Sequence, residues 1–151
     1  MEEIFNFIIC NKALNAAFIA WLAAQIIKMI IALLTEKTFS FRRFMDSGGM
    51  PSSHSSFAVA LCVCIAKIDG FNSSAFAIAA AFACIVMYDA AGVRRAAGEQ
   101  AKVLNKMMNT WENQEPGFVR GELKELLGHT PAQVVAGALL GAVIAYFICW
   151  F

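Results

Sequence analysis

Four apolar runs dominate the chain, and no other feature restricts its fold as strongly. They cover residues 13–34, 54–68, 74–91 and 131–151 and are separated by polar segments. A bilayer core about 30 Å thick takes about 20 helical residues to cross, so runs of roughly this length are typical of membrane-spanning helices. Hydrophobic residues make up 60% of the 151 residues. We therefore expect an all-α integral membrane bundle of about four transmembrane spans.

A helix of different character is expected after the third run. Between Val93 and Trp111 apolar residues recur every three or four positions, and charged residues such as Arg95 and Lys102 occupy the other face. This pattern predicts an amphipathic helix that lies in the membrane interface or across the end of the bundle. The sequence shows no repeat and no second domain, so residues 1–151 are expected to form a single membrane-embedded domain.

The cysteines lie in or beside the apolar runs, at positions Cys10, Cys62, Cys64, Cys84 and Cys149. Cys62 and Cys64 are two positions apart, which directs them to different faces of a helix, whereas zinc ligands usually follow CxxC or i, i+4 spacing. We expect the cysteines to be small buried side chains without a metal. The chain also has no basic tail, so a nucleic-acid partner is not expected.

The alternating spans gather distant polar residues at one face of the membrane. Segments 35–53 and 92–130 both lie on the face where the first span ends, because the second span leaves that face and the third returns to it. The residues that meet there are Lys28, Arg42, Arg43, His54, Asp89, Arg94, Arg95 and His129. Charges within a membrane are costly and usually line a site or pair with each other. The alternatives are snorkelling of Lys28 to the interface and a local ion pair between Asp89 and one of its two neighbouring arginines.

The segment GGMPSSHSS, residues 48–56, gathers turn-forming and polar residues between two apolar runs. Pro51 suits a position at or before the first helical turn, and Ser52 or Ser53 can cap the second span. The N–H groups at such a helix start form an anion site. Ser52 and Ser53 would then present backbone N–H groups to a phosphate, and His54 would stand beside it. The alternative is a capped helix start with an incidental histidine.

The second histidine, in GHTPAQ, has a similar place. Gly128 can end an upstream helix, Thr130 is the expected N-cap, and Gln133 completes a capping box. His129 therefore directly precedes the fourth span, on the same face as His54.

Two histidines among several lysines and arginines indicate phosphate chemistry. One histidine can attack phosphorus while the other protonates the leaving oxygen. Arginines can stabilise the charge on the transferring phosphoryl group. The sequence shows no carboxylate cluster for two metal ions, which disfavours Mg²⁺-dependent hydrolysis.

The segments GGMPSSHS, YDAAGVRRAAGEQA and GHTPAQVVAG together resemble the type 2 phosphatidic acid phosphatase and vanadium haloperoxidase superfamily, and specifically its small divergent branch. PSSH resembles the Pro-Ser-Gly-His signature, and GHTPAQVVAG resembles the last motif. The resemblance covers essentially the whole chain. It implies that His129 is the nucleophile that becomes phosphorylated and that His54 acts on the leaving group. It further implies phosphate binding by basic residues, no metal or other cofactor, and lipid phosphates or pyrophosphates as substrates.

The chain departs from the superfamily pattern in its basic residues. The first motif, a lysine seven positions before an Arg-Pro pair, is absent, and Lys28, Arg42 and Arg43 are candidates for its role by position. The arginine of the last motif would fall at Leu123. We expect the charge to come instead from one of the neighbouring residues Arg94 and Arg95.

The aspartate of the last motif, which orients the nucleophile, would fall at Gln133. Asp89, at the end of the third run, is the candidate for that role. The superfamily core usually has six helices, so a homodimer could supply the missing walls of a four-span bundle.

The distribution of basic residues predicts the orientation. Cytoplasmic loops are enriched in Lys and Arg. Of the twelve basic residues, ten lie on the face of the candidate site, and only Lys12 and Lys67 lie on the other. Without the six basic residues assigned to the candidate site, four remain on this face and two on the other, so the excess still lies on the face of the site. We expect an integral protein of the cytoplasmic or inner membrane, with its site facing the cytoplasm and lipids of the inner leaflet as substrates.

The sequence thus predicts a metal-independent lipid-phosphate phosphatase with His129, His54 and Asp89 as catalytic residues. Its expected partners are a lipid phosphate and the surrounding membrane lipids. A second hypothesis is a protein that binds or moves phosphorylated lipids without hydrolysis, and its support is Leu123 and Gln133 at the motif positions. A third is a structural bundle in which the polar segments only cap helices.

Overall fold

The computed structural model describes residues 11–36, 49–112, 123 and 128–150, and within these ranges all secondary structure is helical. The helices are α2 (Lys12–Glu36), α3 (Ser53–Asp69), α4 (Ser74–Ala91), α5 (Val93–Glu112) and α6 (Pro131–Trp150). The four apolar runs correspond to α2, α3, α4 and α6. The predicted helical membrane bundle is confirmed.

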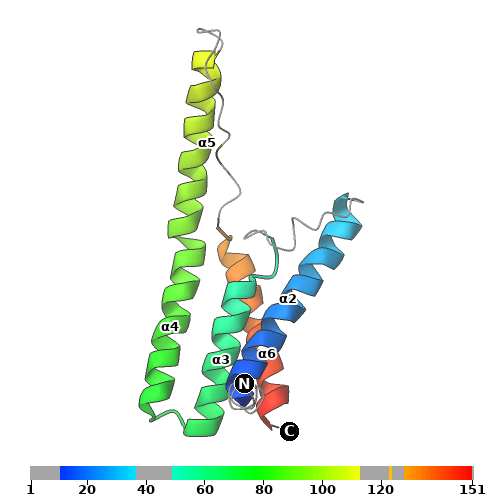
Figure 1. Cartoon of the computed structure of the whole chain (residues 1–151), viewed down its shortest axis with the longest axis vertical. Coiled ribbons are helices and arrows are strands. Elements are labelled where there is room, and N and C mark those ends of the chain that lie inside the picture. Colours follow the sequence, from blue (N-terminus) through cyan, green and yellow to red (C-terminus); the bar gives the residue numbers. More distant parts are fainter. Residues whose placement is uncertain (1–10, 37–48, 113–122, 124–127, 151) are drawn as a thin grey trace, which may run out of the picture.

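Helix α3 lies at the centre of the bundle and packs against α2, α4 and α6 (Figure 1). Helix α2 begins and α6 ends at the lower end of the view, whereas α3 begins well above that end. The alternation of directions expected from the sequence is therefore present. As a result, the first turns of α3 and α6 lie toward the same end of the bundle as the last turns of α2.

Three stretches of the described residues are long and apolar enough to cross a membrane: Lys12–Thr35, Ser74–Met108 and Pro131–Trp150. Helix α3 is not one of them, although the sequence pattern counted it as a span. It has 17 residues, and it begins with the polar turn Ser-His-Ser-Ser. Three of these four residues are buried serines, so this turn faces the interior of the bundle.

Helix α5 is amphipathic as predicted, but it continues α4 in almost the same direction and does not lie across the end of the bundle (Figure 1). The placement across the end of the bundle is therefore wrong, and the placement in the membrane interface stays a prediction. Helical hydrogen bonds run through the junction, since the Gly92 N–H donates to the Tyr88 carbonyl at 2.8 Å and the Ala96 N–H donates to the Gly92 carbonyl at 2.9 Å. With these bonds in place, the chain makes no turn that could fold α5 back over the bundle.

Small side chains build the core of the bundle. Ala16, Ala20 and Ala24 recur every four residues on α2 and are buried. Alanines of α2 pack with Ala60 and Cys64 of α3 and Ala145 of α6 in one cluster. Membrane helices commonly associate through small residues, because these let the backbones approach closely. The Ser56 hydroxyl also donates to the Ala20 carbonyl at 3.0 Å, which ties α3 to α2.

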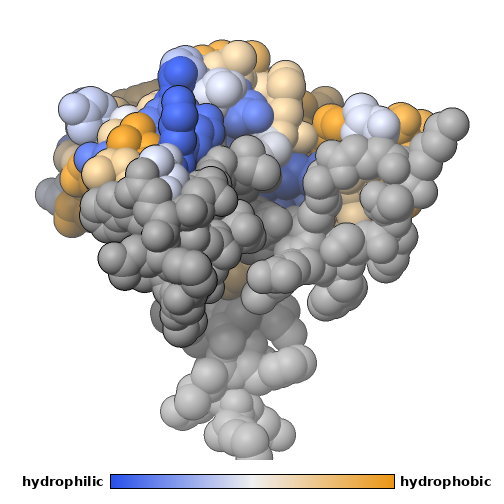
Figure 2. Space-filling view, turned by 90° about the horizontal axis from the view of Figure 1, so that it is seen from above, coloured by the Kyte–Doolittle hydropathy of each residue, from blue (hydrophilic) through white to orange (hydrophobic). Residues whose placement is uncertain are grey.

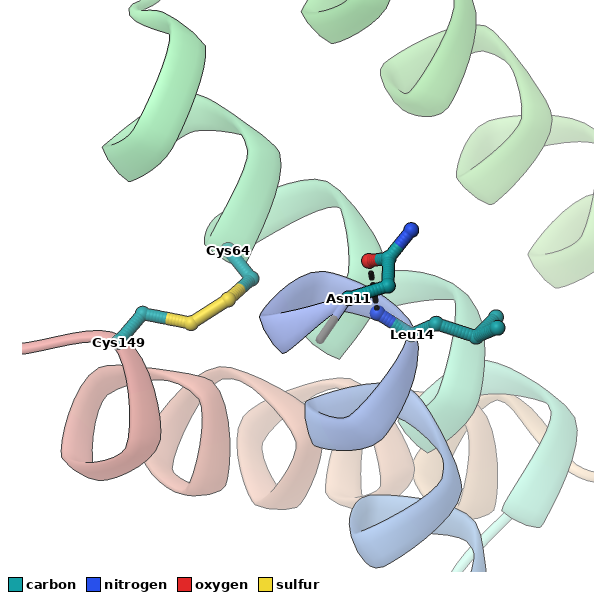
Figure 3. Close-up of a disulfide and its surroundings, with 4 residues drawn as sticks. All are labelled: Asn11, Leu14, Cys64 and Cys149. Atoms are coloured by element: carbon teal, nitrogen blue, oxygen red, sulfur yellow. Dashed lines mark hydrogen bonds between the residues drawn. A yellow bond between two sulfur atoms is a disulfide. The ribbon is translucent and has the colours of Figure 1, made fainter. Parts of the chain in front are cut away.

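A disulfide joins Cys64 of α3 to Cys149 of α6, with their Cα atoms 5.8 Å apart (Figure 3). It lies near the start of α2, where the Asn11 side chain accepts a hydrogen bond from the Leu14 N–H at 2.9 Å. Cys64 is buried as expected, but the sequence did not indicate this bond, because α3 and α6 bring together residues 85 positions apart. Cys62 and Cys84 are free thiols. Cys84 is exposed, so the expectation of burial is wrong for this residue. Cys10 lies outside the described residues.

Candidate functional site

The site begins on α2, where Lys28 is turned into the bundle. This lysine is only 9% exposed, and its ammonium group donates to the Ser53 hydroxyl at 3.2 Å. Gly49, with a φ of 95°, passes over the lysine stem, and a Cβ at this glycine would lie 3.8 Å from the stem carbons. Because its ammonium group points inward, Lys28 does not snorkel to the interface.

Ser52 caps α3, as the sequence predicts. Its hydroxyl accepts a hydrogen bond from the Ser55 N–H at 3.3 Å and another from the Ser55 hydroxyl at 3.0 Å. The Ser52 N–H, which was expected to face a phosphate, instead donates to the Gln133 carbonyl at 3.0 Å. The expectation is therefore wrong for this N–H group, because α6 approaches closely enough to use it. The Ser53 hydroxyl is the serine group that contacts the buried ammonium.

The capping box at the start of α6 is confirmed. The Thr130 N–H donates to Oε1 of Gln133 at 2.9 Å, and the Gln133 N–H donates to the Thr130 hydroxyl at 3.4 Å. The side chain at the position of the superfamily aspartate is thus engaged in a helix cap. It does not hydrogen-bond to the ring of His129, because neither ring nitrogen has a hydrogen-bond partner among the described residues.

The residues before α6 are held against the junction of α4 and α5. The His129 N–H donates to the Ala90 carbonyl at 2.9 Å. Gly128 has a φ of 88°, and a Cβ there would overlap the backbone nitrogen of Arg95. Only a glycine fits this contact, since it supplies both the left-handed conformation and the missing side chain. The backbone thus fixes His129 from the side of α4 and α5.

The two histidines face each other. Their ring centroids lie 6.1 Å apart, with the ring planes inclined by 78°. His54 is half-buried, whereas His129 is 2% exposed. Both nitrogens of His129 are buried without a hydrogen-bond partner in the part of the chain that the structure describes. Since buried polar groups are almost always satisfied, this ring is the most unusual feature of the site.

The surroundings of His129 keep its ring neutral. Burial is the main cause that lowers the pKa of His129 from 6.5 to about 4. The neighbouring charges of Lys28, His54 and Arg94 add to this effect, in that order. A neutral imidazole has a lone pair available at near-neutral pH, as a nucleophile requires.

Asp89 forms an ion pair with Arg94, in which the Nε–H of the guanidinium donates to Oδ2 at 2.6 Å. Both side chains are partly exposed. The local ion pair considered for Asp89 is therefore present, and this carboxylate does not hydrogen-bond to the ring of His129. Arg95 is exposed and contributes its backbone to the contact with Gly128. Arg42 and Arg43 lie outside the described residues.

Seen from the end at which α3 and α6 begin, hydrophilic residues of the described chain gather on the surface among apolar ones (Figure 2). Among the described residues no group of three or more His, Cys, Asp or Glu could hold a metal ion. The described groups that could act on a ligand here are the two imidazoles, the buried ammonium of Lys28 and the guanidinium of Arg94.

Two glycines of α6 were missed in the sequence. Gly137 and Gly141 are buried, and a Cβ at either would overlap a carbonyl oxygen of α3, that of Ser52 or that of Ser56 respectively. The available signal was the four-residue spacing of small residues on both helices, which is typical of closely packed membrane helices. No sequence signal indicated the contact between His129 and Ala90.

Comparison with known proteins gives one family and one relative. The family model described as the Divergent PAP2 family matches residues 9–144. The uncharacterized membrane protein YuiD of Bacillus subtilis (strain 168) is 38% identical over 154 residues, which cover 95% of this chain and 98% of the relative. No solved structure matches the chain. The family match includes both histidines, Lys28, Asp89 and Arg94.

Proposed function

The chain belongs to the Divergent PAP2 family, and on this premise we propose that it is a membrane lipid-phosphate phosphatase. The observation that carries the proposal is the buried ring of His129, which has no hydrogen-bond partner among the described residues and faces His54 at 6.1 Å. Burying such a group costs free energy. A phosphate ligand that the ring attacks would account for this arrangement.

The proposed reaction has two steps. In the first, a ring nitrogen of His129 attacks phosphorus and the bond between phosphorus and the lipid oxygen breaks. A protonated His54 gives its proton to that oxygen, and the lipid alcohol leaves. In the second step water attacks the phosphohistidine, and His54, now neutral, takes a proton from the water. Inorganic phosphate leaves, and both histidines return to their starting states.

The basic residues would bind the phosphate and stabilise its charge. The Lys28 ammonium lies beside Ser53 at the start of α3, close enough for its charge to act on His129. The charge of Arg94 acts on the same ring, and Asp89 holds that guanidinium through its Nε–H group. Preorganised cations of this kind stabilise charge that develops on a transferring phosphoryl group. In this proposal Asp89 acts on Arg94 and not on the nucleophile.

We further propose that the site faces the cytoplasm. The excess of Lys and Arg on the site face supports this orientation, and the Cys64–Cys149 disulfide supports it independently. This disulfide lies toward the opposite end of α3 and α6, and disulfides persist in oxidising compartments outside the cytoplasm. Substrates would then be phosphorylated lipids of the inner leaflet.

A second candidate function is lipid-phosphate binding without hydrolysis. The observation that favours it is the absence, among the described residues, of a carboxylate bonded to the ring of His129. Passage of a lipid phosphate through the bundle is not favoured, because the core beyond the site consists of alanines and the half-cystine Cys64 among apolar neighbours. A binding protein would take up and release its ligand on one face.

The test is phosphate release by the purified protein in EDTA, measured with phosphatidate, phosphatidylglycerophosphate and a polyprenyl pyrophosphate. We expect hydrolysis of at least one of them, inhibition by vanadate, and loss to background in His129→Ala. The denatured wild-type protein should carry covalent phosphate that His129→Ala lacks. His54→Ala should lose roughly 100-fold or more, and Cys84→Ser, on the exposed side of α4, serves as the control.

Binding of vanadate without hydrolysis of any of the three lipids would support the second candidate. Equal hydrolysis by wild type and His129→Ala would exclude the phosphohistidine mechanism.

A further inference from the structure

Helices α3 and α6 are in close contact at two glycines of α6, whose α-carbons carry no side chain. A Cβ added to Gly137 would overlap the carbonyl oxygen of Ser52, and one added to Gly141 would overlap the carbonyl oxygen of Ser56. The two contacts repeat at four-residue spacing on both helices, so they lie one helical turn apart. At each of them the α6 backbone is as close to the α3 backbone as a glycine permits.

The first of these contacts is adjacent to the histidine pair. Ser52 is two residues before His54, and its N–H donates to the carbonyl of Gln133 at 3.0 Å. Gln133 is four residues after His129, in the first turn of α6. The same short stretch of α3 therefore carries one histidine and contacts the helix that follows the other. The separation of the two rings depends on how closely the helices approach here.

We propose that Gly137 is a positioning residue for phosphoryl transfer, because its missing side chain sets the distance between the rings of His54 and His129. This inference rests on the proposed function, in which both rings must reach one phosphate group. One ring attacks phosphorus and the other gives a proton to the leaving oxygen, so their separation must suit both steps. A misplacement of about 1 Å at a reacting centre can cost on the order of 100-fold in rate.

The test compares Gly137→Ala with Gly141→Ala. Each alanine meets the same kind of obstacle, a backbone carbonyl of α3, and would push the helices apart by about 1 Å, since non-bonded heavy atoms settle near 3.5 Å. The second contact is one turn, about 6 Å, farther from the histidines. We expect Gly137→Ala to lower kcat about 100-fold at nearly unchanged KM, because Lys28 and Arg94 lie on other helices. Gly141→Ala should lower kcat less than tenfold at a similar loss of thermal stability.

Two further measurements separate positioning from folding. Molecules in which α3 and α6 have assembled carry the Cys64–Cys149 disulfide, so these two cysteines do not react with an alkylating reagent. Activity is expressed per molecule protected in this way. NMR titration of His129 reports the environment of its ring without any turnover. Gly137→Ala should raise the pKa of His129 from about 4 toward 6.5, because the widened contact admits water, whereas Gly141→Ala should leave it near 4.

Equal losses of kcat in the two variants, with the pKa of His129 unmoved in both, would overturn the inference. Failure of Gly137→Ala alone to form the disulfide would assign this glycine to folding and would overturn it too. If the wild-type protein hydrolyses no lipid phosphate, the proposed function falls, but the NMR titration still decides whether Gly137 sets the surroundings of His129.

Discussion

The N–H of His129, two residues before α6, donates to the carbonyl oxygen of Ala90 at 2.9 Å and joins this segment to the end of α4. Beside this bond, Gly128 lies on the backbone of Arg94 and Arg95 at the start of α5. The proposed nucleophile is therefore held through main-chain contacts, and its ring is left without hydrogen bonds to the described residues. Substitutions that disturb these main-chain contacts should therefore lower the activity.

Gly128→Ala should lower both stability and activity. Its φ of 88° costs a residue with a Cβ about 1–2 kcal/mol, and its Cβ would also overlap the backbone of Arg95. We expect a loss of activity on the order of 100-fold, because His129 is the next residue. Phosphate release and thermal unfolding measure the two effects.

Gly70→Ala is the matched control for this variant. Gly70 has a φ of 84° but nothing within 4 Å of its Cβ position, and it ends α3 far from the histidines. It should show the cost of the left-handed conformation alone, with activity retained. A similar loss of activity in both variants would mean that the contact of Gly128 with Arg95 does not position His129.

Stability and activity should both decrease at acid pH through His129. Its pKa is about 4 in the folded protein and 6.5 ordinarily, so between these values the unfolded chain binds more protons. The contribution of this ring to stability is therefore complete above pH 6.5 and is lost as the pH falls toward 4. The difference in unfolding temperature between wild type and His129→Gln should shrink over that window.

Activity should follow the same group, with an acid limb near pH 4 in kcat/KM, because only the neutral ring can attack phosphorus. Lys28→Met removes one of the charges that depress this pKa, so its His129 should titrate above 4 by NMR. An unchanged titration in Lys28→Met would contradict the placement of this ammonium beside the ring.

Asp89→Asn should weaken binding of the lipid phosphate and leave the stability of the protein almost unchanged. The ion pair with Arg94 is partly exposed, and exposed pairs contribute about 0–1 kcal/mol, so the unfolding temperature should hardly change. Because the guanidinium loses its fixed partner, KM for the lipid phosphate should rise roughly tenfold, since a misplaced charge binds phosphate less well.

Glu99→Gln provides the control, since Glu99 pairs with Lys102 at 3.0 Å on the exposed surface of α5. We expect this variant to retain the wild-type KM. If Asp89→Asn instead lowered kcat alone and altered the pH profile of His129, Asp89 would be acting on the nucleophile as the superfamily pattern implied.

The disulfide can be checked by counting thiols. In denatured, unreduced protein Cys64 and Cys149 should not react with a maleimide, and after reduction two additional thiols should react, visible as a mass shift. Cys64→Ser should remove both of these additional thiols from the difference and leave Cys149 reactive from the start. Equal labelling before and after reduction would show that the two cysteines are not bonded.

The helix ends and caps could be predicted because their signals are local. Helix α4 has the bounds 74–91 that the apolar run indicated, and Ser52 and Thr130 cap as their residue types suggest. The gathering of Lys28, His54, Asp89 and His129 at one end also followed, since alternating spans leave few ways to place them.

The contacts between helices could not be predicted in the same way. The pairing of Cys64 with Cys149 and the contact of Gly137 with Ser52 depend on the rotation of α6 about its own axis, which an almost uniformly apolar helix does not reveal. The partner of Asp89 was open for a similar reason, because Arg94 and Arg95 are sequence neighbours and only the helix direction past Gly92 decides between them.

The bond between Cys64 and Cys149 has a consequence for how a lipid could enter. Helices α3 and α6 are tied covalently at one end, where Lys67 also lies 3.6 Å from the ring centre of Trp150. Near the histidines they meet through bare α-carbons. These two helices form a fixed frame that cannot part without breaking one of these connections. Among the described helices, α2 and the long α4–α5 helix are therefore the ones that can move to admit an acyl chain while α3 and α6 stay together.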